Sequence, residues 1–244
     1  MILGDYIILG FCAKYLFFVK KISVGYFTNT KNHTTGKYRP INKQENPTSS
    51  VFVINTEESN IKQVYDANGY LDNLFLDLIN NYNFPVDKAT IFYIFDRDVK
   101  SNTDSALIRD LIQKLGNSRD NDDFNQAGLL LLSYPAIESF TISNFKDECF
   151  KLEYELGSEI KAYLNKNNLS NQRINEKSLA KAAFEMFLAL DDIGIKSWDL
   201  DYFKDVNKKI FEYQELYYSN NSVYKVLSLL CFAFIDLGLI ELEE

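Results

Sequence analysis

The run TIFYIF, residues 90–95, is the feature that most restricts the fold of this chain. Its β-branched, aliphatic and aromatic residues follow one another without the polar alternation of a strand that has one solvent-facing side. A strand of this kind is covered on both faces, as in parallel sheets that carry helices on either side. The run therefore predicts an α/β fold with a buried strand at its centre.

Further segments fit that prediction. Short apolar runs at 6–9, 51–54 and 128–132 indicate three more strands, and helical spacing of apolar residues indicates helices over 14–22, 69–82 and 104–115. Strands that alternate with helices are typical of βαβ units in a mostly parallel sheet flanked by helices. We expect this α/β domain to span residues 1–145.

The second part of the chain has a different pattern. Helical periodicity with few strand signals covers 146–165, 175–192, 199–218 and 222–240, which predicts an all-helical bundle or cap over residues 146–244. The last of these segments is apolar nearly all round, so neighbouring elements or another subunit should bury it. Core packing is the default for it, and a homodimer or partner interface is the alternative.

The helix expected over 175–192 has two distinct sides. Asn175 or Ser178 can cap its start. Lys177, Lys181 and Glu185 form the polar side, and the apolar side that should face the core is formed by Leu179, Ala183, Phe184, Phe187 and Leu188.

Charge restricts the function. The net charge is −8 and the pI is near 4.9, whereas a protein that coats duplex nucleic acid is usually basic. An acidic enzyme can still act on nucleic acid where basic residues gather locally. The polar stretch 28–50 is the most basic surface segment, with one acid against Lys31, Lys37, Arg39 and Lys43. A connection of this length without structure is uncommon in a compact domain, which indicates a functional or mobile segment.

Cysteine and histidine usage argues against zinc. Cys12, Cys149 and Cys231 are far apart, and His33 is the only histidine, so zinc ligands or a histidine-based triad would have to be scattered. Free buried thiols in a reducing compartment are the better interpretation. Residues 6–19 lack the flanks of a signal peptide, and charged residues interrupt 223–240, so we expect a cytoplasmic protein without a membrane segment.

Asp96-Arg97-Asp98 directly follows the central strand. Ligands of open α/β sheets bind beyond the carboxyl ends of strands. Two aspartates one residue apart in an extended segment lie on the same side, where their oxygens suit Mg²⁺ or Mn²⁺. Such an ion can activate water against a phosphodiester. The alternative is that both aspartates cap the following turn and helix.

A second motif adds context. The apolar run 129–132 leads into SYPAIESF, residues 133–140. This arrangement, downstream of a strand that ends in Asp-Arg-Asp, resembles the S-N-P-C-F-E-L-W segment of the RloB-like branch of the Toprim superfamily. The resemblance covers residues 6–145. It implies a Toprim-like sheet, a metal-dependent nuclease of bacterial anti-phage (abortive infection) defence, and an ATPase partner. It also implies that Asp96 and Asp98 bind the metal and that Glu138 assists as ligand or base.

One position departs from the Toprim pattern. Gly10 stands where the family has its first glutamate, so the usual set of metal ligands lacks one member. Glu138 is the preferred replacement, although an acid in the first turn of a helix is equally explained by the helix dipole. Two other groups are better explained as solvated turns or loops, namely Glu57 and Glu58, and Asp120, Asp122 and Asp123.

Basic residues near the motif complete the candidate site. Arg97 should point away from the two aspartates, where it can contact phosphate or pair with a carboxylate. Lys100, Lys37 and Arg39 can contact nucleic acid, although solubility is the commoner role of such residues. Three hypotheses follow, in this order: a nuclease, a non-catalytic Toprim-like subunit that binds an ATPase partner or senses an invader, and a sugar-nucleotide transferase.

Overall fold

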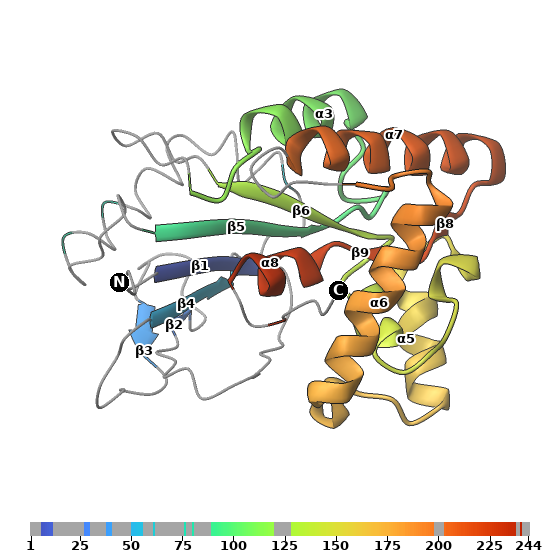
Figure 1. Ribbon diagram of the computed structural model, residues 1–244, viewed down its shortest axis with the longest axis horizontal. Coiled ribbons are helices and arrows are strands. Elements are labelled where there is room, and N and C mark those ends of the chain that lie inside the picture. The colour runs from blue at the N-terminus through green and yellow to red at the C-terminus, as the bar shows by residue number, and fades with distance from the viewer. Residues whose placement is uncertain are drawn as a thin grey trace.

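The computed structural model describes residues 6–11, 27–29, 38–40, 50–55, 89–119, 128–197 and 203–237, together with Ile61, Leu76, Asn80 and Ile240. For the strands before residue 60 the description covers the backbone. Within these residues the chain has an α/β architecture, with a mixed sheet and helices on its flanks and beyond its end (Figure 1). The predicted α/β class is confirmed.

The main sheet has the strand order β4-β1-β5-β6-β9. Its strands are β4 (Ser50–Asn55), β1 (Tyr6–Phe11), β5 (Ala89–Asp96), β6 (Leu129–Tyr134) and β9 (Leu227–Ser228). The first four are parallel, and β9 runs antiparallel to β6. All residues of β6, and residues 90–95 of β5, are buried, as the unbroken apolar runs predict.

The helices divide into two groups. α3 (Ser105–Lys114) packs against α7 (Phe203–Asn221) along one side of the sheet. In Figure 1 the parallel strands run toward α5 (Gly157–Lys166) and α6 (Glu176–Asp192). The short helices α4 (Glu138–Ser143) and α8 (Leu230–Asp236) both contact β6, so they connect these groups to the sheet.

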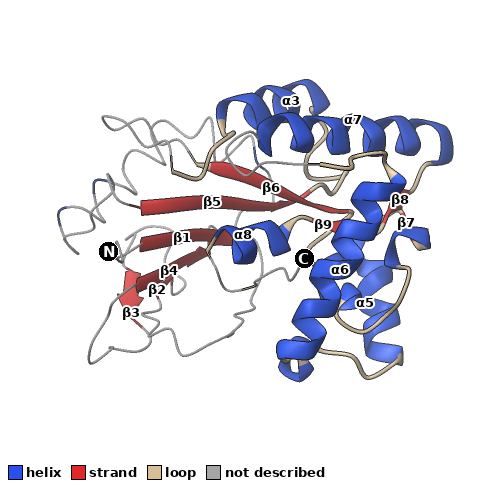
Figure 2. Cartoon of the chain, viewed as in Figure 1, coloured by secondary structure: helices blue, strands red, loops and turns tan. Residues whose placement is uncertain are grey.

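The expectation of an all-helical C-terminal part needs correction (Figure 2). β7 (Glu153–Tyr154) pairs with β8 (Tyr224–Lys225), and β9 joins the main sheet, so the final helix is confined to α8. By pairing with the edge of β6, β9 satisfies the hydrogen bonds of backbone groups on that strand. The need for such a partner arises only in the folded sheet, so sequence periodicity cannot reveal it. One hydrophobic cluster contains residues from both sides of position 145, among them Phe92, Leu131, Phe211 and Phe232.

The stretch 28–50 also holds more structure than expected. β2 (Phe27–Asn29) and β3 (Tyr38–Pro40) form an antiparallel pair in which Arg39 lies opposite Thr28. Two other predictions concern segments that are wholly or largely outside the described residues. The helix over 14–22 is one of them, and within 69–82 only Leu76 and Asn80 are described, both of them helical.

The orientation of α6 differs from the prediction, although its start does not. Asn175 accepts the backbone N–H of Ser178 and caps the helix as expected. Phe184 and Leu188, however, are exposed, while Glu185 is buried and accepts the N–H of Cys149 at 2.8 Å. The buried side is instead formed by small and flexible residues that allow close approach of the backbone, namely Leu179, Ala182, Ala183, Met186, Ala189 and Leu190.

The described cysteines, Cys149 and Cys231, are free and buried, as predicted. Burial raises the pKa of the Cys149 thiol to about 12, which makes it unreactive near neutral pH. Among the residues that the structure describes, no helix combines the length and the apolar character needed to traverse a bilayer.

Candidate functional site

Asp96 ends β5 and connects it to the region after β6. It lies opposite Ser133 in the parallel register, at the carboxyl edge of the sheet. Its Oδ1 accepts the backbone N–H of Ile137 at 2.7 Å, directly before α4. The strand end and the start of α4 therefore hold the Asp96 carboxyl group in place.

Burial and neighbouring acids disfavour a negative charge on Asp96. The pKa of this carboxyl is raised to about 7, first by burial, then by the charge of Glu138, with a smaller contribution from Asp98. The hydrogen bond from Ile137 and the charge of Lys161 act in the opposite direction without offsetting the rise. The structure thus brings the three predicted acids together closely enough for their charges to interact.

Glu138 lies in the first turn of α4 and is only 7% exposed. Its Oε1 forms an ion pair with the Nζ of Lys161 on α5 at 2.9 Å. The packing around it is tight, because a Cβ placed on Gly157 would lie 3.3 Å from Glu138 Oε2. The positive charge of Lys161 therefore lies near three acidic side chains, those of Asp96, Asp98 and Glu138.

Asp98 closes the turn that follows the strand. Its Oδ1 accepts the N–H of Lys100 at 3.0 Å, and its Oδ2 accepts the hydroxyl of Ser101 at 2.9 Å. Its backbone carbonyl accepts the N–H groups of Ser101 and Asn102. The capping role considered for this residue is present. Each carboxylate oxygen still has a second lone pair, so capping by itself does not prevent metal coordination.

Arg97 lies on the opposite side of the segment and is 2% exposed. Its Nε and Nη2 donate to the two carboxylate oxygens of Glu215 on α7, at 2.7 and 2.8 Å. Nη1 donates to the carbonyl of Asn102, and Nη2 also donates to the hydroxyl of Ser105. The Tyr224 ring lies 5.7 Å from the guanidinium carbon and adds a cation–π contact.

The carboxylate of Glu215, like the guanidinium of Arg97, has several hydrogen-bond partners. The hydroxyl groups of Ser105 and Tyr224 donate to it at 2.6 and 2.8 Å, in addition to the two bonds from Arg97. Burial by itself raises the pKa of Glu215, but the hydrogen bonds from Arg97, Ser105 and Tyr224 together with the charge of Arg97 lower it overall. This buried ion pair joins the start of α3 to α7.

The interpretation of Arg97 as a nucleic-acid contact is therefore corrected. Its guanidinium is buried and bonded to protein, which is the carboxylate pairing that was the alternative. Lys100 is exposed beside the site. Lys37 lies outside the described residues, and Arg39 is described only as backbone in β3.

The Gly10 backbone lies between Ile54 and Tyr93 in the sheet, near the carboxyl end of β1. This neighbouring strand contributes no side chain to the site at that position. The other acids considered as replacements lie outside the described residues, namely Glu57, Glu58, Asp120, Asp122 and Asp123.

The chemistry of the donors determines which metal the site fits. All available groups are carboxylate oxygens, which suit Mg²⁺ or Mn²⁺. Within the described ranges, no group of three or more His, Cys, Asp and Glu side chains is arranged to hold a metal ion. Mg²⁺ usually binds through one or two carboxylates and completes its ligands with water, so its binding does not require a closed protein cage.

Sequence reasoning missed two charged residues that pair with the predicted site residues. Glu215 is 118 positions from Arg97, and Lys161 lies on a helix whose spacing indicates only ordinary amphipathic packing. A bidentate partner for a buried arginine was foreseeable as a residue type, but its position was not.

Comparison with known proteins finds no match, either among family models, among curated proteins or among solved structures.

Proposed function

We propose that this chain is a Toprim-like, Mg²⁺- or Mn²⁺-dependent nuclease of bacterial anti-phage (abortive infection) defence that cleaves nucleic-acid phosphodiesters in the cytoplasm. The observation that carries the proposal is the position of Asp96, which lies half-buried at the carboxyl end of a parallel strand, with Glu138 and Asp98 close enough to raise its pKa. Crowded acids of this kind cost free energy unless a cation or a proton relieves them.

Each acid has a distinct role in this proposal. Asp96 and Asp98 would hold the cation, which when bound supplies an activated water and stabilises the leaving oxygen. Glu138 accepts a proton or completes the ligand set, and Lys161 orients it through their ion pair. Lys100 is exposed beside Asp98 and can contact phosphate. Lys37 and Arg39 can do so as well if the β2–β3 pair lies along the substrate.

Cleavage assays test the proposal. Purified protein with Mn²⁺ or Mg²⁺ should nick DNA or cleave RNA, and Asp96→Asn should reduce the rate about a hundredfold or more. Asp110→Asn provides the matched control, because Asp110 is an exposed acid on α3. Cleavage that survives Asp96→Asn, or that stays absent even with an ATPase partner, would show that the catalytic proposal is wrong.

A second candidate function is a non-catalytic Toprim-like subunit that binds an ATPase partner or senses an invader. Two observations favour it: Gly10 replaces a ligand of the family, and the described residues contain no group of three ligands. Calorimetric titration with Mg²⁺ separates the two functions. Binding that is lost in Asp98→Asn supports the nuclease, whereas a wild-type protein that binds no ion supports the second candidate.

A further inference from the structure

The outer side of α6 carries large apolar side chains that the core does not use. Phe184 is 59% exposed and Leu188, one turn later, is 39% exposed. The same helix buries its opposite side in the main hydrophobic cluster, so its orientation is set by packing and cannot turn these residues inward. Neighbouring exposed apolar residues on one helix are typical of interaction surfaces.

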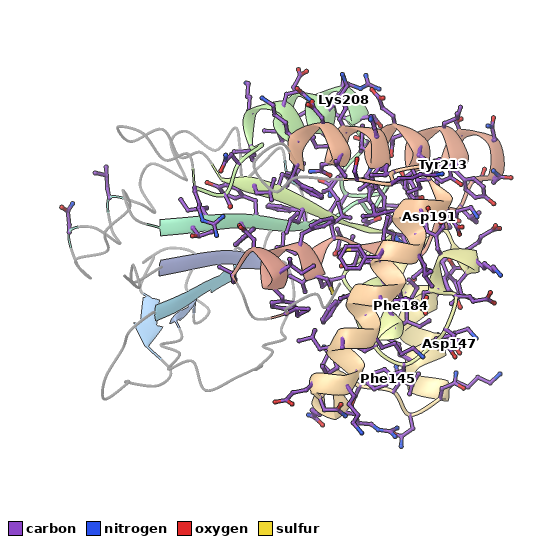
Figure 3. All side chains as sticks on the ribbon, in the orientation of Figure 1. Phe145, Asp147, Phe184, Asp191, Lys208 and Tyr213 are labelled. Atoms are coloured by element: carbon purple, nitrogen blue, oxygen red, sulfur yellow. The ribbon has the colours of Figure 1, made fainter. Side chains whose placement is uncertain are left out.

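The charges around this pair follow a symmetric pattern. Lys177 lies seven residues before Phe184 and Asp191 lies seven residues after it, and both are exposed. Because seven residues make nearly two helical turns, both charges lie within about 20° of Phe184 around the helix and about 10 Å from it along the axis. Figure 3 labels Phe184 and Asp191 along α6.

We infer that this surface, which we call the α6 face (Lys177, Ala180, Phe184, Leu188 and Asp191), binds a second copy of the chain. Two α6 helices would lie antiparallel about a two-fold axis at Phe184. Lys177 of each copy would then face Asp191 of the other, so that both charge pairs are attractive. The helix dipoles would also be antiparallel, and the Phe184 and Leu188 side chains would bury one another at the centre.

The charge order distinguishes a second copy from other partners. A surface that is positive at one end, apolar at its centre and negative at the other end is complementary to itself when rotated by half a turn. The face is one helix wide, smaller than the roughly 1,600 Å² of total buried area in a standard stable interface. The dimer should therefore be in equilibrium with monomer and depend on concentration. This inference is independent of the proposed nuclease function.

Sedimentation equilibrium of the full chain tests the inference. The wild type should shift from a 28.3 kDa species toward twice that mass as its concentration rises. Lys177→Glu by itself, and Asp191→Lys by itself, each make both pairs repulsive, so each should weaken dimerisation about tenfold. The double variant Lys177→Glu/Asp191→Lys restores opposite charges and should recover the wild-type dissociation constant.

The control lies elsewhere on the surface. Lys166→Glu changes an exposed charge on α5 and should leave dimerisation unchanged. Because all of these side chains are exposed, the variants should fold, and circular dichroism checks this. A wild type that stays monomeric up to about millimolar concentration overturns the inference, since weaker association would be worth less than about 4 kcal/mol. A dimer whose dissociation constant in both single variants equals that of the wild type overturns it as well, as does a double variant that fails to recover the wild-type value.

Discussion

The two sides of the segment Asp96-Arg97-Asp98 handle buried charge in opposite ways. On one side, Arg97 meets one carboxylate, Glu215, and hydroxyl or carbonyl groups satisfy the remaining donors and acceptors. On the other side, Asp96 lies near Glu138 and Asp98, and Lys161 is the cation that partly compensates them.

This difference separates a fully paired charge from a carboxyl group that can still take up a proton or a cation. A buried ion pair with all of its hydrogen bonds made joins elements together and leaves nothing to react. A half-buried carboxyl with a pKa near 7 is only partly charged at neutral pH and can exchange a proton or accept a cation at little cost. Substitutions on each side test whether the two sides differ in this way.

The largest effect is expected on the Arg97 side. Glu215→Ala leaves a buried guanidinium unpaired and should cost about 3–5 kcal/mol of unfolding free energy in urea titrations. Glu212→Ala, on the same helix, removes an exposed pair with Arg109 whose atoms are 3.9 Å apart, and should cost well under about 1 kcal/mol. Equal losses in the two variants would mean that the buried pair contributes no more than a surface contact.

On the acid side, by contrast, the charge of Asp96 should lower the free energy of unfolding. The pKa of Asp96 is about 7 in the folded state and 3.8 ordinarily, so between these values the folded protein binds a proton that the unfolded chain releases. Stability should therefore fall as pH rises from about 4 to about 7, with a total change of about 2–4 kcal/mol.

Asp96→Asn removes this dependence and should make the protein more stable at pH 8, as measured by urea titration with EDTA present. Asp110→Asn, which changes an exposed acid, should keep the wild-type pH profile. An Asp96→Asn variant with an unchanged profile, or with lower stability at pH 8, would contradict the raised pKa.

Packing around Glu138 gives an intermediate effect. In Gly157→Ala the new Cβ would lie 2.5 Å from the Cβ of Ala136, so the start of α5 must shift away from the segment between β6 and α4. We expect a loss of about 1–3 kcal/mol in unfolding free energy. Ser158→Ala, one residue along and exposed, should change stability by less than about 0.5 kcal/mol, and a similar loss there would contradict a specific clash at Gly157.

The smallest change in stability concerns Lys161. Lys161→Met removes an exposed partner of Glu138, so the unfolding free energy should change by less than about 1 kcal/mol. The pKa of Asp96 should nevertheless rise further, because the lysine charge lowers it. Carboxyl ¹³C NMR titration measures this. A pKa of Asp96 that stays the same, or that shifts equally in Lys166→Met, would show that Lys161 does not act on the acids.

Local patterns in the sequence predicted much of the α/β part. The unbroken apolar run before Asp96 predicted a strand buried on both faces, and β5 is such a strand. Asn175 caps α6 through its side chain, as predicted from the residue type at that helix start. These features depend on residues within a few positions of one another, so the chain specifies them before any long-range contact forms.

Tertiary structure decided the rest. Phe184 and Glu185 are adjacent in sequence, yet the aromatic ring is exposed and the carboxylate is buried, because Cys149 supplies a hydrogen-bond donor and small neighbours bring the helix close. Likewise, Glu215 pairs with Arg97, and burial together with Glu138 raises the pKa of Asp96, although both partners are distant along the chain. Periodicity reports which residues share a helix side, but the free energy of a buried charge depends on the partners that folding places beside it.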